Sequence, residues 1–205
     1  MSVEQTAEDG LLTVRGRAKA SRRAALLTAA ANLFAARGFN GVSIEDLGSA
    51  AGVSGPAVYR HFTGKHAVLA ALLVGVSQDL YDGGQAVVAA SKDAAAALRG
   101  LIEFQVDFAL SNADVIRVQD RELETLSDDD GHDVRVLQRQ YVEVWVDVLA
   151  RVHPDAEREL LRMRAHAAFG LINSTPHSTH RRRTTKDAAA LRRVLEQMAW
   201  AALTC

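Results

Sequence analysis

The chain has 205 residues, of which 48 % are hydrophobic, with a formal net charge of −1 and one cysteine, Cys205. This composition can bury a core, excludes an intrachain disulfide, and leaves no apolar run long enough to cross a bilayer. The acidic N-terminus lacks the basic start and apolar stretch of a secretory signal, so we expect a cytoplasmic protein with no membrane partner.

The small net charge hides a basic block near the start of the chain. Between residues 11 and 66, eight Lys and Arg stand against two acids, Glu45 and Asp46, whereas the remainder of the chain is acidic. This asymmetry indicates that the first third of the chain binds a polyanion. A solvated basic surface without a partner is the alternative that charge alone leaves open.

Apolar residues recur at helical spacing along most of the chain, and we find no convincing strand. Leu26, Ala30 and Leu33 form one such stripe, and Gly38 supplies the left-handed residue that often ends a helix. We therefore expect an all-α fold. The expected helices cover residues 21–37, 43–52, 55–62, 65–82, 94–110, 114–126, 133–152, 154–173 and 185–203.

Three segments interrupt the helical pattern. Gly83-Gly84 is expected to weaken and end the fourth helix. Residues 127–132, with three consecutive Asp, and residues 174–183, with Pro176 and three Arg, are expected to be loops.

Residues 43–66 carry the strongest functional signal. Ser43 and Asp46 form a capping-box-like pair that starts one short helix, and Pro56 lies in the first turn of the next. Two helices of about two turns, joined by residues 52–54, have the size and spacing of a helix-turn-helix. Small residues on its open face would let base edges approach closely, and polar aromatic residues would bind phosphates.

Lys65 lies in the first turn of the following helix, where a cation opposes the helix dipole. A phosphate docked on the free backbone N–H groups would reverse the sign of that interaction. We therefore expect Lys65 to contact the DNA backbone.

Several motifs occur in order and without gaps between residues 21 and 69. They are Phe34-x-x-x-Gly38-Phe39, Ser43-Ile-Glu-Asp-Leu47, Ala51-Gly-Val-Ser54 and Val58-Tyr-Arg-His-Phe62-x-x-Lys65-x-x-Val68-Leu69. This pattern resembles the DNA-binding domain of the tetracycline-repressor (TetR) family. The resemblance implies an all-helical homodimer with a three-helix DNA-binding head and a larger, variable ligand-binding body.

The resemblance also assigns DNA contacts to individual residues. The phosphate contacts it implies are Ser43, Tyr59, His61 and Lys65, and the groove contacts are Ser54, Gly55, Ala57 and Arg60. Where the family often has Lys-Gly, this chain has Gly55-Pro56, so its base preference should differ.

A basic segment precedes the head. Residues 15–23 hold five cations and no acid. An arm containing Arg15 and Arg17 could enter a narrow minor groove, and Arg22 would lie at the start of the first helix of the head, beside the phosphates. A solubilising tail is the alternative. We expect residues 1–20 to be a flexible arm, 21–66 the DNA-binding domain, and 67–205 the ligand-binding and dimerisation domain.

The second domain offers candidates for a ligand pocket between helices. The aromatic candidates lie on three expected helices and as a group could line an apolar cavity, although core packing is the simpler explanation for any one of them. They are Phe104, Phe108, Tyr141, Trp145 and Phe169, and the candidate polar anchors are Arg117, Arg121, Arg162 and Asn173. By family analogy, Arg181, Arg182 and Arg183 could meet the phosphates of an acyl-coenzyme A.

In the family that the chain resembles, the last two helices form the dimer interface, here residues 155–173 and 186–203. A two-fold axis would bring two recognition helices to successive major grooves about 34–36 Å apart. We therefore expect a near-palindromic operator on double-stranded DNA.

Two other classes of function are alternatives to a DNA-binding regulator. An enzyme would need a reactive motif, but Gly64-Lys65 lacks the glycine of a phosphate-binding loop five residues earlier, and His177-x-x-His180 has no further metal ligand nearby. No enzyme, metal or cofactor is therefore expected. A helical protein-interaction module without specific DNA binding would explain the helices but leaves the basic head without a role. We expect a repressor released by a small, largely apolar molecule, with an acyl-coenzyme A thioester as one candidate.

Overall fold

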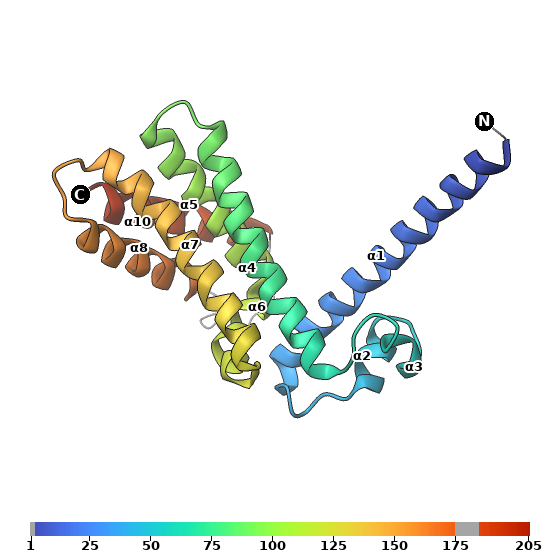
Figure 1. The fold of residues 1–205 in the computed structure, drawn as a ribbon. Coiled ribbons are helices and arrows are strands. Elements are labelled where there is room, and N and C mark those ends of the chain that lie inside the picture. The colour runs from blue at the N-terminus through green and yellow to red at the C-terminus, as the bar shows by residue number, and fades with distance from the viewer. Residues whose placement is uncertain (1–2, 175–184) are drawn as a thin grey trace. The chain divides into compact units, whose positions relative to one another are not determined.

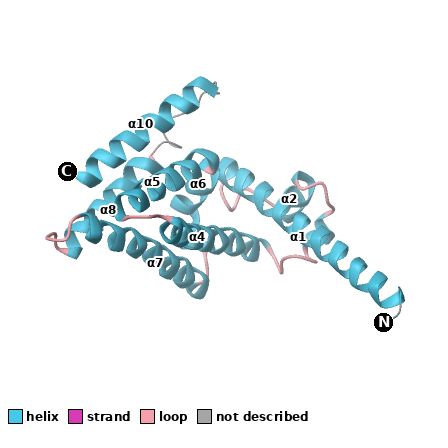
Figure 2. Ribbon diagram, turned by 90° about the horizontal axis from the view of Figure 1, so that it is seen from above, coloured by secondary structure: helices cyan, strands magenta, loops and turns pink. Residues whose placement is uncertain are grey.

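The computed structural model describes the backbone of residues 3–174 and 185–205, and the side chains of residues 16–174 and 187–205. All regular elements in these ranges are helices, which confirms the predicted all-α fold (Figures 1 and 2). In chain order they are α1 (Val3–Arg37), α2 (Ile44–Ala50), α3 (Gly55–Val58), α4 (Lys65–Ala90), α5 (Ala94–Ser111), α6 (Ala113–Glu122), the 3₁₀ turn η1 (Leu123–Thr125), α7 (Asp128–Val152), α8 (Arg158–Asn173) and α10 (Thr185–Thr204).

The chain divides into two compact units, Met1–Leu72 and Leu73–Cys205. The first unit is called the head below and the second the body. The division falls inside α4, which runs through it as one uninterrupted helix. The sequence predicts a boundary after residue 66, near the start of this same helix.

The head is built around the C-terminal half of α1. Leu26 and Phe34 of α1 are fully buried, as are Leu47 of α2 and Val58 of α3. Gly38 ends α1 with a positive φ of 74°, as its place in the sequence predicts, and its N–H donates to the carbonyl oxygen of Phe34 at 2.9 Å. The helices of the head are therefore held by one small apolar core.

Helix α1 begins at Val3, eighteen residues before the expected start at Ser21. Residues 3–20, which the sequence predicts to be a flexible arm, are part of this helix in the structure. This segment contains no proline, and its glycines at 10 and 16 weaken a helix without ending it. Arg17 consequently lies on a helix rather than in a flexible arm, and Arg22 lies on the helix as predicted.

Helix α4 continues through Gly83-Gly84 to Ala90, so the predicted helix end at these glycines is also wrong. Their role is close packing. A Cβ atom at Gly83 would clash with the ring of Phe104 on α5, and one at Gly84 would lie 2.5 Å from Cε2 of Tyr141 on α7. Glycine is required here because two aromatic rings occupy the space of a side chain.

Two helix starts differ from the prediction. Helix α7 begins at Asp128 instead of residue 133, because Ser127 caps it by accepting a hydrogen bond from the N–H of Asp130 at 3.1 Å. Acidic residues in the first turn also interact favourably with the helix dipole. Helix α8 begins at Arg158, after a turn that follows Pro154, instead of at the proline itself.

The body packs α5, α7, α8 and α10 against one another. Its largest fully buried side chain is that of Trp145 on α7, which lies in one continuous apolar cluster with Leu101 of α5, Leu161 of α8 and Leu203 of α10. Within the described residues, no helix has both the length and the apolar character needed to cross a membrane.

The close packing at Gly84 predicts that alanine will destabilise the protein there but not at Gly75, an uncrowded site of the same helix. Gly84→Ala should lower the free energy of unfolding by about 1–2 kcal/mol, because the added methyl group overpacks against the buried ring of Tyr141. Gly75→Ala is the control, because a Cβ there meets no atom within 4 Å, and it should raise stability by up to about 1 kcal/mol. Urea denaturation of both variants measures the difference, and equal effects would contradict the packing role.

Candidate functional site

The start of α2 is fixed by a complete capping box. The Oγ of Ser43 accepts a hydrogen bond from the N–H of Asp46 at 3.0 Å, and Oδ2 of Asp46 accepts from the N–H of Ser43 at 2.9 Å. These bonds confirm the predicted cap. The backbone hydrogen bond from Ser43 is the largest cause that lowers the pKa of Asp46, and Arg37, whose guanidinium lies 3.5 Å away, adds to it. Ser43 itself is exposed.

Helix α3 is shorter than predicted. It ends at Val58, and residues 59–61 continue as turns, with the N–H of His61 donating to the carbonyl oxygen of Val58 at 2.9 Å. Pro56 lies in its first turn, as expected. Gly48 of α2 allows the close approach of the connecting turn, because a Cβ atom there would lie 2.9 Å from the carbonyl oxygen of Val53.

The predicted groove residues lie at the surface of this turn and helix. Ser54 and Arg60 are exposed, while Gly55 and Ala57 are half-buried. The hydroxyl of Ser54 makes no capping bond to α3. Tyr59 is 57 % exposed, which makes it the most exposed large hydrophobic side chain among the described residues. A phenol in this position is available to an external partner.

His61 is less accessible than predicted. The residue is half-buried, and its Nδ1 atom is buried without a hydrogen-bond partner among the described residues. A phosphate contact by this side chain would therefore have to use Nε2. Its role in DNA binding stays a prediction.

Lys65 has partners inside the head that the sequence did not reveal. Its ammonium group donates to the carbonyl oxygens of Phe39 at 2.7 Å and Val42 at 2.8 Å, and lies 4.3 Å from the centre of the Phe39 ring. These contacts compensate the unfavourable helix dipole without a phosphate. Lys65 therefore ties the start of α4 to the loop between α1 and α2, and its phosphate contact stays a prediction.

The basic residues ahead of the head are only partly described. Arg17 and Arg22 are exposed on α1, whereas the side chain of Arg15 lies outside the described residues. The guanidinium of Arg23 lies 5.1 Å from the centre of the Phe62 ring, a cation–π contact that attaches α1 to the turn after α3.

A cavity of about 210 Å³ lies in the body. Three predicted pocket residues, Tyr141, Phe169 and Asn173, line it. Trp145 lies behind this wall, with its ring centre 4.9 Å from that of Phe169. The full lining is Ser77, Leu80, Gln105, Gln119, Gln138, Tyr141, Val142, His166, Phe169 and Asn173.

The other predicted pocket residues do not join this cavity. Phe104 and Phe108 line a separate hollow of about 350 Å³ beside α4. The guanidinium of Arg117 pairs with Asp114 at 2.7 Å, and that of Arg121 lies 3.7 Å from Glu122.

Arg162 is also engaged outside the cavity, because it donates to Glu143 on α7 at 2.6 and 2.8 Å. Arg181, Arg182, Arg183, His177 and His180 lie outside the described residues.

A buried polar chain, missed in the sequence, forms one side of the cavity. The hydroxyl of Tyr141 donates to Oε1 of Gln105 at 3.0 Å, and Nε2 of Gln105 donates to Oδ1 of Asn173 at 3.0 Å. Gln105 is 1 % exposed. Burial raises the pKa of Tyr141 far above its ordinary value, so the phenol stays protonated. The available signal was an amide on the apolar stripe of α5, one turn after Leu101.

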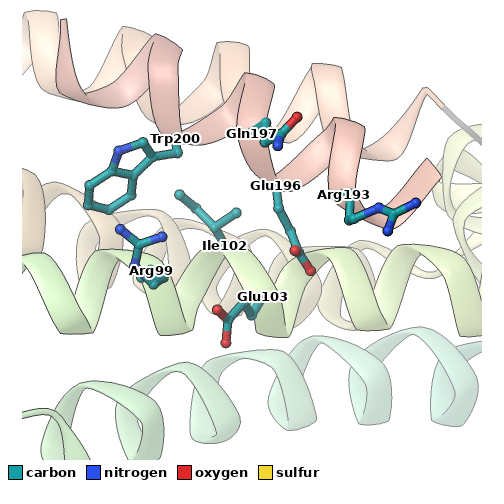
Figure 3. A pocket seen from close by; sticks show the side chains of 7 residues that line it. All are labelled: Arg99, Ile102, Glu103, Arg193, Glu196, Gln197 and Trp200. Atoms are coloured by element: carbon teal, nitrogen blue, oxygen red, sulfur yellow. The ribbon is translucent and has the colours of Figure 1, made fainter. Parts of the chain in front are cut away.

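A third hollow, of about 170 Å³, lies between α5 and α10 (Figure 3). Arg99 of α5 faces Trp200 of α10, with its guanidinium 4.2 Å from the ring centre. Glu103 and Glu196 also line the hollow, so its wall carries both acidic and basic side chains. Among the side chains that the structure describes, no group of three or more His, Cys, Asp or Glu could hold a metal ion.

Two parts of the chain match models of known families. Residues 26–72 match bacterial regulatory proteins of the tetR family, and residues 91–177 match the tetracyclin repressor-like C-terminal domain. Together the matches cover well over half of the chain and fall in both compact units. The chain belongs to the TetR family.

Known TetR-family proteins resemble the chain in sequence and fold. The HTH-type transcriptional repressor KstR2 of Rhodococcus jostii (strain RHA1) is 30 % identical over 132 residues, which are 64 % of this chain and 65 % of that repressor. The matched region thus spans just under two thirds of that relative.

Solved structures share the fold over more of the chain. A TetR-family transcriptional regulator from Bordetella parapertussis 12822 has a TM-score of 0.75 and 24 % identity, over 86 % of this chain and 93 % of that one. The structure of AibR in complex with isovaleryl coenzyme A and operator DNA has a TM-score of 0.70 and 16 % identity, over 87 % and 98 %. At these identities the likeness establishes a shared fold.

The internal partners of Lys65 predict a structural cost when its charge is removed. Lys65→Met keeps most of the stem but removes the ammonium donor from the carbonyls of Phe39 and Val42, and should lower the free energy of unfolding by about 2 kcal/mol. Lys19→Met, at an exposed site of α1, is the matched control and should change it little. Chemical denaturation that gives the same stability for both variants would refute the structural role.

Proposed function

We propose that the chain is a homodimeric transcription repressor that binds a near-palindromic DNA operator through its head and releases it when a small molecule enters the body. The observation that supports this most strongly is the exposed surface of α3 and the turn after it. There Tyr59, Ser54 and Arg60 are all exposed. Such a surface combines groups that bind phosphates with small residues that admit base edges.

The charge of the head supports a polyanionic partner. Arg17 and Arg22 are exposed on α1, and Arg60 is exposed after α3. Because cations near phosphates release condensed counterions, this surface would bind DNA with an affinity that falls as salt rises. Sequence preference would come from α3 and Arg60, while Tyr59 and the cations of α1 would position the head.

A homodimer is supported by apolar side chains on the last two helices. Apart from Tyr59, the exposed large hydrophobic residues of the described chain are Leu160 and Met163 on α8, and Val194 and Met198 on α10. Helices α8 and α10 pack against each other. An uncovered apolar surface of this kind is unfavourable in water, and a second copy related by a two-fold axis would cover it.

The effector is proposed to occupy the cavity of the body. Leu80, Val142 and Phe169 supply apolar walls, and amide and hydroxyl groups supply a few polar contacts, which is the usual make-up of a small-molecule site. The structure of AibR, which shares the fold, contains isovaleryl coenzyme A. An acyl-coenzyme A thioester is therefore one candidate effector for this chain.

Helix α4 is the proposed route from effector to DNA. Its residues Ser77 and Leu80 line the cavity, and its first residue, Lys65, is bonded to the loop that precedes α2. A ligand that contacts Ser77 and Leu80 differently in two positions of α4 would favour one of them. This difference in affinity is what would release the operator.

DNA binding is tested by gel shift with the purified protein and the DNA upstream of its own coding sequence. We expect a sequence preference that survives moderate salt, and Tyr59→Phe should weaken binding to every sequence about fivefold, because one hydrogen bond to phosphate is lost. Tyr81→Phe, the same change on α4 in the body, is the control and should leave affinity unchanged. Binding that lacks sequence preference would instead support a protein-interaction module.

The dimer is tested by placing a charge in its proposed interface. Met163→Glu should convert the dimer to a monomer in analytical ultracentrifugation, because burying an unpaired carboxylate is costly. Ala89→Glu introduces the same charge at an exposed site of α4 and should leave the dimer intact. Two variants with the same sedimentation coefficient would contradict the interface on α8 and α10.

A further inference from the structure

We propose that the cavity selects an uncharged, ring-sized group that carries a hydrogen-bond acceptor, and that Asn173 donates to this acceptor. The inference deepens the proposed function, since it names the class of effector for the same cavity. It depends on three observations: the volume of the cavity, the absence of charge on its described lining, and the direction of its hydrogen-bond chain.

The volume of the cavity is sufficient for a ring-sized group. The cavity measures about 210 Å³, whereas a cavity of about 150 Å³ is enough to hold benzene. The site can therefore enclose a ring with a short substituent or a branched acyl group. The cavity is open to solvent on one side, so the phosphates of a coenzyme A ester would extend outside it.

The lining selects against charge. Its described residues include no Asp, Glu, Lys or Arg, and the imidazole of His166 is exposed at the edge. Tyr141 stays a neutral phenol because burial raises its pKa. A carboxylate that entered this cavity would lose part of its hydration without gaining a Lys or Arg partner, which is unfavourable.

Gln119, Gln138 and His166 also line the cavity, but the donor that belongs to its buried hydrogen-bond chain is on Asn173. Tyr141 donates to Gln105, and Gln105 donates to Oδ1 of Asn173. Because the chain ends on this oxygen, Nδ2 of Asn173 is the donor that it leaves for a ligand. Ser77 does not compete, because its hydroxyl donates to the carbonyl oxygen of Leu73 at 2.8 Å. A ketone, amide or thioester carbonyl would complete the chain.

Three probes of similar size separate these requirements. Acetophenone carries a neutral acceptor, ethylbenzene has none, and benzoate is an anion. Saturation-transfer NMR on the full-length protein should show acetophenone binding, with ethylbenzene about fivefold weaker and benzoate at least about tenfold weaker. Benzoate binding as tightly as acetophenone would overturn the inference.

A matched variant tests the role of Asn173. Asn173→Asp keeps the oxygen that accepts from Gln105 but removes the Nδ2 donor, so acetophenone should bind at least about fivefold more weakly. Asn32→Asp makes the same chemical change at an exposed site of α1 and should have no effect. Equal acetophenone affinity in both variants would overturn the assignment.

Operator affinity, measured by gel shift on the same samples, separates this inference from the proposed function. If the protein binds the operator but none of the three probes, the proposed effector class is wrong and the proposed DNA-binding function is retained. If acetophenone binds as expected but the protein binds no DNA with sequence preference, the proposed function is wrong and the proposed ligand selectivity of the cavity is retained.

Discussion

One helix, α4, belongs to both compact units, and the proposed link between effector and DNA depends on it. Helix α4 runs without a break from Lys65 to Ala90, and specific contacts hold it at both ends. In the head, the ammonium group of Lys65 binds the carbonyl oxygens of Phe39 and Val42. In the body, Gly83 and Gly84 leave room for aromatic rings of α5 and α7. In the proposed mechanism, these contacts would let a ligand-dependent change at the cavity alter the head.

The features predicted correctly from the sequence are those with local causes. The capping box of Ser43 and Asp46 and the left-handed Gly38 depend on residues within a few positions of each other. The start of α7 after Ser127 also has a local cause, but it was not predicted. The three consecutive Asp residues were interpreted as a loop, although acidic residues are favourable in the first turn of a helix. By contrast, Gly83-Gly84 was interpreted as a helix end, because its reason lies in rings that are remote in the sequence.

The same limit applies to the candidate site. Tyr141, Phe169 and Asn173, which the sequence predicts as pocket residues, line one cavity, and their contact with a ligand stays a prediction. Phe104, Phe108, Arg117 and Arg121 were not placed there, because helix periodicity does not fix which face of the bundle is hollow. Gln105 and the internal partners of Lys65 depend on contacts between distant segments. Hydrogen bonds and contacts between residues that are distant in the sequence could not be predicted from the sequence alone.

Coupling through α4 is the central claim, and it can be tested without a known effector because linkage is reciprocal. Hydrogen–deuterium exchange of the protein should be compared with and without operator DNA selected from random duplexes. We expect DNA binding to change exchange in residues 74–90 of α4 and around Gln105, in addition to the head. A change confined to residues before Lys65 would contradict the claim that the cavity and the DNA surface are linked by this helix.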